Sequence, residues 1–395
     1  MCAGIGNEVR TIAFLIMTKL TIGFLRRGYS PTGGVEAYLK GLARGLLAEG
    51  HRPVLFGTDS WPVSEWPGGE ILRCRGKSLS AYAGEVLCHK ESSGIPFDLT
   101  LSVEKVPGCD IYRTDEGVHA AWLHARSPHI SPWAGFYQGI SPKHREKRRL
   151  EREIFKSGCT RLVVSLSQGI SRDITSYYGY PSGQITLIRN GVSGPGLVPL
   201  QRKEAARREL GISPGEKVVL FVGTGWERKG LRFAIRATEL LGDSKVKLLV
   251  AGKGPEWKYD SPVVRFLGPV KEMESVYAAA ELLLFPTIYD PFPLSAMEAL
   301  AAGVPVITTA ANGVSEIMTA GLHGEIVQNP SDVTALSKAL DKWIALLEDP
   351  ERSLLTRESC VALASQYTLE RNLRETLAVI RELMEEKRGQ VTVNR

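Results

Sequence analysis

With 395 residues, of which 43% are apolar, the chain is long enough for two α/β domains that each bury a core of ordinary size. Its six cysteines form neither a CxxC pair nor a regular framework, which excludes a disulfide scaffold and a structural zinc site and fits a reducing cytoplasm. The formal net charge is +6, but no recognised nucleic-acid-binding module accompanies it, so nucleic acid is not an expected partner.

The first sixteen residues hold one apolar run, residues 11–16, which is too short to span a bilayer and has no small-residue cleavage site. Residues 17–25 then begin like the first strand of an α/β domain. We therefore expect residues 1–16 to form an extension outside the fold. The expected location is the cytoplasm, with a peripheral place on the inner face of the cytoplasmic membrane as the alternative.

A first Rossmann-like domain is predicted over residues 17–192. It opens with a strand at 20–25, a loop that ends in Gly33 and Gly34, and a helix whose apolar residues follow the 3.6-residue period. Glycines at this point let a ligand approach the N-terminus of the helix, although a tight turn explains them almost as well. Further strands are predicted at residues 53–57, 99–103, 111–114 and 161–165, with helices between them.

The basic excess lies in the first half of the chain. Residues 1–195 contain 24 Lys and Arg against 17 Asp and Glu, whereas residues 196–395 contain 25 against 26. Much of the excess falls in residues 143–152, a predicted helix. Two interpretations stay open: a solvated face with internal ion pairs, or weak association with an anionic partner such as a membrane surface or a phosphorylated acceptor.

Residues 189–199 are rich in Gly and Pro and lack periodicity, so a domain boundary is predicted there, with a linker over 193–212. A second Rossmann-like domain is predicted over 213–366. Its strands alternate with helices, which is typical of a parallel doubly wound sheet. A final helix within 367–395 is expected to cross back to the first domain. The strands are predicted at residues 218–222, 247–251, 263–267, 282–285 and 304–308.

The loops at the C-terminal ends of these strands are where open α/β sheets bind ligands. Residues 223–230 match neither a GxxxxGK[ST] loop nor a GxGxxG fingerprint. They do bring two cations, Arg228 and Lys229, to the mouth of a helix. We interpret the pair as a diphosphate site, although a surface Arg-Lys pair is usually just solvated.

Residues 285–307 contain two acids, Asp290 and Glu298, eight positions apart across a loop-to-helix junction. Pro293 suits the first residue of a helix that ends before Gly303. The backbone amides of Leu294 and Ser295 would then face an anion such as a diphosphate. One acid lies on each side of that anion, as a donor sugar and a ribose require. A solvated loop acid with a helix-surface glutamate is the alternative.

Together these segments resemble the retaining, nucleotide-sugar-dependent glycosyltransferases of family 4 over nearly the whole chain, from residue 20 to about residue 380. The Asp290-to-Glu298 segment, with Phe292, Pro293, Leu294 and Ser295 between the acids, is similar to that family's E-x7-E signature. Arg228 and Lys229 fall where the family has its diphosphate-binding cations. Gly33 and Gly34 are similar to its glycine pair near the donor phosphate. The first acid is Asp rather than Glu, which leaves the donor sugar open.

The resemblance implies a GT-B fold, two Rossmann-like domains facing across a cleft, and hexosyl transfer with retention. It implies that the first domain, 17–192, binds the acceptor and the second, 213–366, the nucleotide sugar. It implies that Asp290 contacts the donor sugar and Glu298 the ribose, and that Phe292 to Ser295 belong to the donor site. The pattern is most similar to bacterial lipopolysaccharide-core glucosyltransferases, with UDP-glucose or a similar donor and a glycan or glycolipid acceptor. By the same analogy, Asp115 or His119 lies near the acceptor; a helix N-cap and a hydrogen-bonded helix histidine are the alternatives.

No DxD triplet occurs in the sequence, so no metal and no cofactor are expected besides the nucleotide-sugar co-substrate. Two other functions compete. A nicotinamide-dependent dehydrogenase is disfavoured, because neither domain carries GxGxxG with an acid about 20 residues on. A non-catalytic binding protein with a degenerate site is the alternative outside enzymes.

Overall fold

The computed structural model describes residues 19–393 except residues 32, 157, 194–195 and 197–199. The predicted extension, residues 1–16, lies outside the described residues, as does part of the predicted linker. None of the described helices is both long enough and apolar enough to cross a bilayer.

The first domain is built on a seven-stranded parallel sheet with the strand order β3-β2-β1-β4-β5-β6-β7. Its strands are β1 (Thr21–Leu25), β2 (Arg52–Gly57), β3 (Ile71–Arg73), β4 (Leu99–Ser102), β5 (Ile111–Arg113), β6 (Leu162–Ser165) and β7 (Ile185–Leu187). Its helices are α2 (Gly34–Ala48), α3 (Leu79–Ser92), α4 (His119–Arg126), α5 (Pro132–Ile140), α6 (Pro142–Ile154) and α7 (Gln168–Tyr178).

The second domain has a six-stranded parallel sheet with the strand order β10-β9-β8-β11-β12-β13. Its strands are β8 (Lys217–Val222), β9 (Val246–Ala251), β10 (Val264–Gly268), β11 (Leu282–Phe285), β12 (Val306–Thr309) and β13 (Gly324–Val327). Its helices are α8 (Leu200–Glu209), α9 (Leu231–Leu241), α10 (Met273–Ala279), α11 (Leu294–Ala301), α12 (Val333–Glu348) and α13 (Pro350–Ala364).

Both faces of the second sheet are buried, as a parallel sheet between helices requires. Along β8, Val218 and Leu220 belong to the core beneath α10 and α11, whereas Val219 and Phe221 belong to the core beneath α9 and α12. The alternation follows from the two-residue period of a strand. The predicted α/β class, with two Rossmann-like domains, is therefore confirmed.

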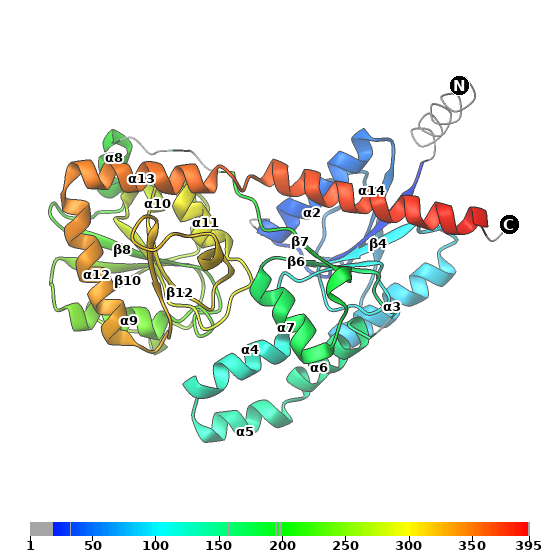
Figure 1. Cartoon of the computed structure of the whole chain (residues 1–395), viewed down its shortest axis with the longest axis horizontal. Helices are drawn as coiled ribbons and strands as arrows, with labels where there is room; N and C mark the ends of the chain where they lie inside the picture. The colour runs from blue at the N-terminus through cyan, green and yellow to red at the C-terminus, as the bar shows by residue number, and fades with distance from the viewer. Residues whose placement is uncertain (1–18, 32, 157, 194–195, 197–199, 394–395) are drawn as a thin grey trace.

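The last helix, α14 (Leu369–Val393), lies along the first domain although it follows the second in sequence (Figure 1). Two glycines of α2 let the helices approach closely. A Cβ on Gly41 would lie 2.9 Å from Leu373 Cδ1, and a Cβ on Gly45 would lie 2.9 Å from Leu377 Cδ1. The chain thus passes between the domains twice.

The two crossing segments pair with each other. Val192 forms a parallel bridge with Thr368, and a Cβ on Gly191 would lie only 2.1 Å from the carbonyl oxygen of Thr368. A third contact between the domains involves Glu316, whose carboxylate accepts hydrogen bonds from the backbone N–H groups of Gln168 and Gly169 at 2.9 and 2.7 Å. The N-terminus of a helix favours such a negative charge. These contacts place the strand ends of the two sheets opposite each other.

Candidate active site

The loop between β8 and α9 carries the two predicted cations, Arg228 and Lys229. It ends at Gly230, which has a φ of 79° and lies so close to the end of β11 that a Cβ there would be 1.9 Å from the carbonyl oxygen of Pro286. Only glycine meets both conditions without strain. The turn therefore holds Arg228 and Lys229 directly before α9, next to the loop that follows β11.

Asp290 meets both cations. Its Oδ2 lies 3.1 Å from Arg228 Nη1 and 3.5 Å from Lys229 Nζ. The Lys229 ammonium also lies 4.5 Å from the ring centre of Phe285, and burial lowers the pKa of Lys229. Asp290 itself is 7% exposed. The result is a partly buried cluster with one more positive than negative charge, at the carboxyl edge of the sheet.

Glu298 lies one turn into α11 and faces a different cavity of about 420 Å³. Tyr277 of α10 donates a hydrogen bond to Glu298 Oε2 at 2.8 Å. Burial raises the pKa of Glu298, and the Tyr277 hydrogen bond opposes that rise. The cavity is also lined by Ser193, Lys271, Glu272, Met273, Glu274 and Ala302.

A cavity of about 190 Å³ lies between the domains and brings most of the predicted residues together. The second domain contributes Arg228, Lys229, Asp290, Phe292, Pro293 and Leu294. The first domain contributes Gly34, Val35, Tyr38, Arg113, Asp115, Asn190 and Gly191. The approach is close at Gly34, where a Cβ would lie 2.3 Å from Leu294 Cδ1. Pro293 is the N-cap of α11 rather than its first residue.

Besides Glu298, three predicted residues do not line this cavity. Gly33 is the N-cap of α2, and a Cβ there would lie 1.8 Å from Glu36 Oε2. Ser295 is buried, and its Oγ has no hydrogen-bond partner among the described residues. His119 begins α4 and lies elsewhere in the first domain, where its Nε2 is 3.0 Å from His144 Nδ1.

His119 makes a stability prediction possible. Burial, with Lys105 and Lys147 nearby, lowers the pKa of His119 from 6.5 to about 3. The unfolded chain therefore takes up this proton more readily than the folded one, so His119 costs stability as the pH falls from 6.5 towards 3. His119→Gln should unfold at a lower pH than the wild type in a circular-dichroism titration. The matched change at the exposed His124, His124→Gln, should leave the midpoint in place, and equal midpoints for all three proteins would contradict the prediction.

Among the residues that line these cavities but were not predicted, three make side-chain hydrogen bonds to predicted site residues. Arg113 ends β5, two positions before Asp115. A cation at the C-terminal end of a predicted strand is the sequence feature that indicates a ligand-binding position here. Asn190 follows β7 inside the Gly-rich boundary, and Tyr277 lies on a short helix. Neither Asn190 nor Tyr277 carries a local signal, because each acts through residues far along the chain.

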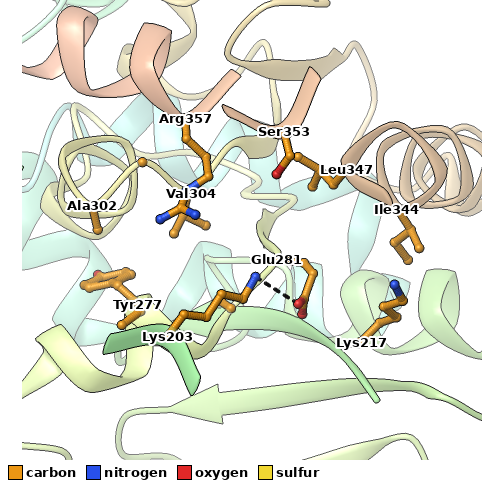
Figure 2. A pocket seen from close by; sticks show the side chains of 13 residues that line it. Lys203, Lys217, Tyr277, Glu281, Ala302, Val304, Ile344, Leu347, Ser353 and Arg357 are labelled. Atoms are coloured by element: carbon orange, nitrogen blue, oxygen red, sulfur yellow. Dashed lines mark ion pairs between the residues drawn. The ribbon is translucent and has the colours of Figure 1, made fainter. Parts of the chain in front are cut away.

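A third cavity, of about 70 Å³, lies at the opposite edge of the second sheet, where its strands begin (Figure 2). Arg357 and the Lys203–Glu281 ion pair, 3.0 Å long, border it, and Tyr277 separates it from the cavity of Glu298. No predicted site residue lines it. Within the residues that the structure describes, no group of three or more His, Cys, Asp or Glu is arranged to hold a metal ion.

Two Rossmann-like domains whose strand ends face each other across a cavity define the GT-B class of glycosyltransferase fold. Residues 216–346, most of the second domain, match the family model described as glycosyl transferases group 1. This match lies within the second domain, and with it the resemblance to glycosyltransferases found in the sequence is confirmed.

Known glycosyltransferases are similar to this chain over most of its length, in sequence and in structure. The lipopolysaccharide glucosyltransferase WaaG of Escherichia coli is 24% identical over 359 residues, which cover 84% of this chain and 91% of WaaG. A crystal structure of WaaG superposes with a TM-score of 0.75 at 22% identity, over 91% of this chain and 99% of that one. Anabaena HepE in complex with UDP and glucose gives a TM-score of 0.68 at 16% identity, over 91% and 99% of the two chains. The GT-B fold is thereby confirmed.

Proposed function

We propose that the protein is a retaining glycosyltransferase that moves a hexose from a UDP-sugar, such as UDP-glucose, to a lipopolysaccharide-core or other glycan or glycolipid acceptor. One observation carries the proposal: Arg228, Lys229 and Asp290 form a cluster that faces Asp115 across the cavity between the domains. The name of WaaG supports the class of acceptor, and the UDP and glucose bound to HepE support the donor.

In the proposed reaction the acceptor hydroxyl attacks the anomeric carbon from the face that the diphosphate leaves. The bond from that carbon to the β-phosphate oxygen breaks, and this oxygen takes the proton of the hydroxyl. Arg228, Lys229 and the N-terminal amides of α11 stabilise the charge that develops on the phosphate. Asp290 contacts the sugar, Glu298 the ribose, and Asp115 orients the acceptor hydroxyl.

The direct test is a donor-hydrolysis panel with UDP-, GDP- and ADP-sugars, combined with thermal shift. Stabilisation by UDP or a UDP-sugar together with release of the sugar supports the proposal. Stabilisation by NAD alone would favour a dehydrogenase. Stabilisation by UDP without turnover of any donor or acceptor would favour a binding protein.

Turnover is expected to persist when divalent cations are chelated. The leaving phosphate has two protein cations at hand, Arg228 and Lys229, which can stabilise its charge without a metal. Donor hydrolysis should therefore have the same rate in EDTA as in Mg²⁺ or Mn²⁺. Loss of most activity in EDTA, with recovery on adding either ion, would contradict this part of the proposal.

We further propose that helix α5 rests on an anionic membrane surface beside the acceptor. Trp133, Phe136 and Tyr137 of α5 are 77%, 61% and 67% exposed, and α5 projects from the first domain beside α4 (Figure 1). The next helix, α6, is basic, with one internal i,i+4 ion pair, Arg149–Glu153. Aromatic side chains next to cations suit the interface of an anionic bilayer.

Replacing Trp133 by serine should therefore weaken sedimentation with phosphatidylglycerol vesicles, and raising the salt should release the wild type. Trp257, which is 79% exposed on the second domain, provides the matched control, since Trp257→Ser should bind as the wild type does. Equal binding to neutral and anionic vesicles would refute the electrostatic part. Equal loss in both variants would refute the role of α5.

A further inference from the structure

The side chain of Asn190 contacts both domains at once. Its carbonyl oxygen accepts a hydrogen bond from Arg113 Nη2 at 2.5 Å, in the first domain. Its Nδ2 donates to the carbonyl oxygen of Phe292 at 2.8 Å, in the second. An amide is suited to this position because it is an acceptor at one atom and a donor at the other.

On the side of the first domain, the contact continues to Asp115. Arg113 is 1% exposed, its guanidinium carbon lies 3.9 Å from the ring centre of Tyr38, and its Nη1 donates to Asp115 Oδ1. A planar guanidinium fixed by one carboxylate, one amide and one ring cannot turn without losing a partner. Asp115 is therefore oriented by Arg113, and its other oxygen, Oδ2, has no partner among the described residues.

On the side of the second domain, the contact continues to the donor cluster. Phe292 is two positions after Asp290, so its backbone belongs to the loop that holds that acid. Its side chain is 2% exposed and anchors the loop in the core. The same loop is tied at its other end, where the N–H of Gly313 donates to the carbonyl oxygen of Asp290 at 3.0 Å. A continuous series of contacts thus runs from Asp290 through Phe292, Asn190 and Arg113 to Asp115.

We propose that Asn190 is a positioning residue that couples the two acids, so that Asp115 is held in its orientation only while the Phe292 carbonyl is in place. The proposal rests on the proposed function, in which Asp115 orients the acceptor and Asp290 contacts the donor. When the domains separate, the bond from Asn190 to Phe292 breaks, Arg113 loses its fixed amide partner, and Asp115 is released. Binding of the donor and presentation of the acceptor are thereby linked.

The first experiment needs no substrate. Hydrogen exchange is measured on the full chain for the wild type, Asn190→Ala and Asn329→Ala, the last a change at an exposed asparagine outside the cavities. In Asn190→Ala the amides of residues 114–118 should exchange faster, and so should those of Asp290 and Gly313, whose hydrogen bonds hold the Asp290 loop. Asn329→Ala should match the wild type at both places. Faster exchange at Asp290 and Gly313 with unchanged exchange at 114–118 would overturn the coupling, as would no change at either place.

The second experiment asks whether Asn190 acts through Asp115. Loss of a hydrogen bond to a charged group corresponds to a fall in kcat of about tenfold to a hundredfold for Asn190→Ala, with the affinity for UDP retained. In the Asp115→Asn background, the same change should lower kcat by no more than about twofold. Penalties that multiply would overturn the proposal, because a merely structural loss is independent of Asp115.

The two experiments separate the two hypotheses. If the wild type turns over no nucleotide sugar, the proposed function fails, and hydrogen exchange still decides whether Asn190 couples the segments. If turnover is normal and the penalties multiply, the coupling fails while the proposed function stands.

Discussion

Lys229→Ala should lower kcat/KM for the nucleotide-sugar donor by about 10²–10³, the usual effect of removing one preorganised group that stabilises a developing oxyanion. Lys229 is the more buried of the two cations: its side chain is 12% exposed, against 28% for Arg228. Its charge therefore acts in a region of low dielectric, where an electrostatic interaction is strongest.

The Lys229 site is also shaped for an unbranched chain. A Cβ on Gly223 would lie 2.7 Å from Lys229 Cε, so the backbone leaves little space beside the side chain. Lys229→Arg should consequently restore only part of the activity, although it keeps the charge. Lys253→Ala, a change at an exposed lysine in the neighbouring loop, is the control and should keep full activity. A loss of less than tenfold in Lys229→Ala, with an unchanged melting temperature, would refute the assigned role.

Substitution of Glu298 and substitution of Asp290 are expected to impair different steps, UDP binding and sugar transfer respectively. Glu298→Gln should weaken UDP binding by about tenfold to a hundredfold, because a hydrogen bond to a charged acceptor contributes about 1.5–3 kcal/mol. Tyr277 can still donate to the glutamine oxygen, so the fold around Glu298 should be retained. Calorimetry with UDP measures this effect directly.

Asp290→Asn should leave UDP binding unchanged or slightly tighter. The carboxylate lies 3.1 Å from Arg228 and 3.5 Å from Lys229, so its removal makes the phosphate site more positive. The loss should appear in kcat/KM for the donor, by about tenfold to a hundredfold, because contact with the sugar hydroxyls matters most as the anomeric carbon gains positive charge. Glu256→Gln, at an exposed acid, is the control. Equal weakening of UDP by both active-site variants would refute the division of roles.

Most strands were predictable because a parallel strand between helices is a short continuous apolar run. The three that were not predicted, β3, β7 and β13, are edge strands of their sheets, and their central residues are only partly buried. An edge strand has one neighbour and needs no such run. Its position depends on the strand beside it, here β2, β6 and β12.

The sequence alone determined the half of the candidate site that the second domain contributes. Arg228, Lys229 and Asp290 follow predicted strands of one parallel sheet, and such strands end at a common edge, so local pattern is enough to bring them together. Glu298 was predictable in the same way, from its place on the helix that follows Asp290.

Only the tertiary structure decided the other half. Arg113 and Asn190 are 77 positions apart, and their contact depends on how distant segments of the first domain pack. Asn190 and Phe292 are 102 positions apart, and their contact depends on how two folded domains meet. Asp115 and His119 lie four positions apart in one stretch of sequence, yet Asp115 lines the cavity while His119 pairs with His144 of α6. The physical reason is that Arg113, Asp115 and Asn190 are positioned by contacts between segments far apart in the sequence. One such contact is that of Tyr38 of α2, the helix on which α14 packs, with Arg113. Contacts of this kind leave no pattern in the neighbouring residues.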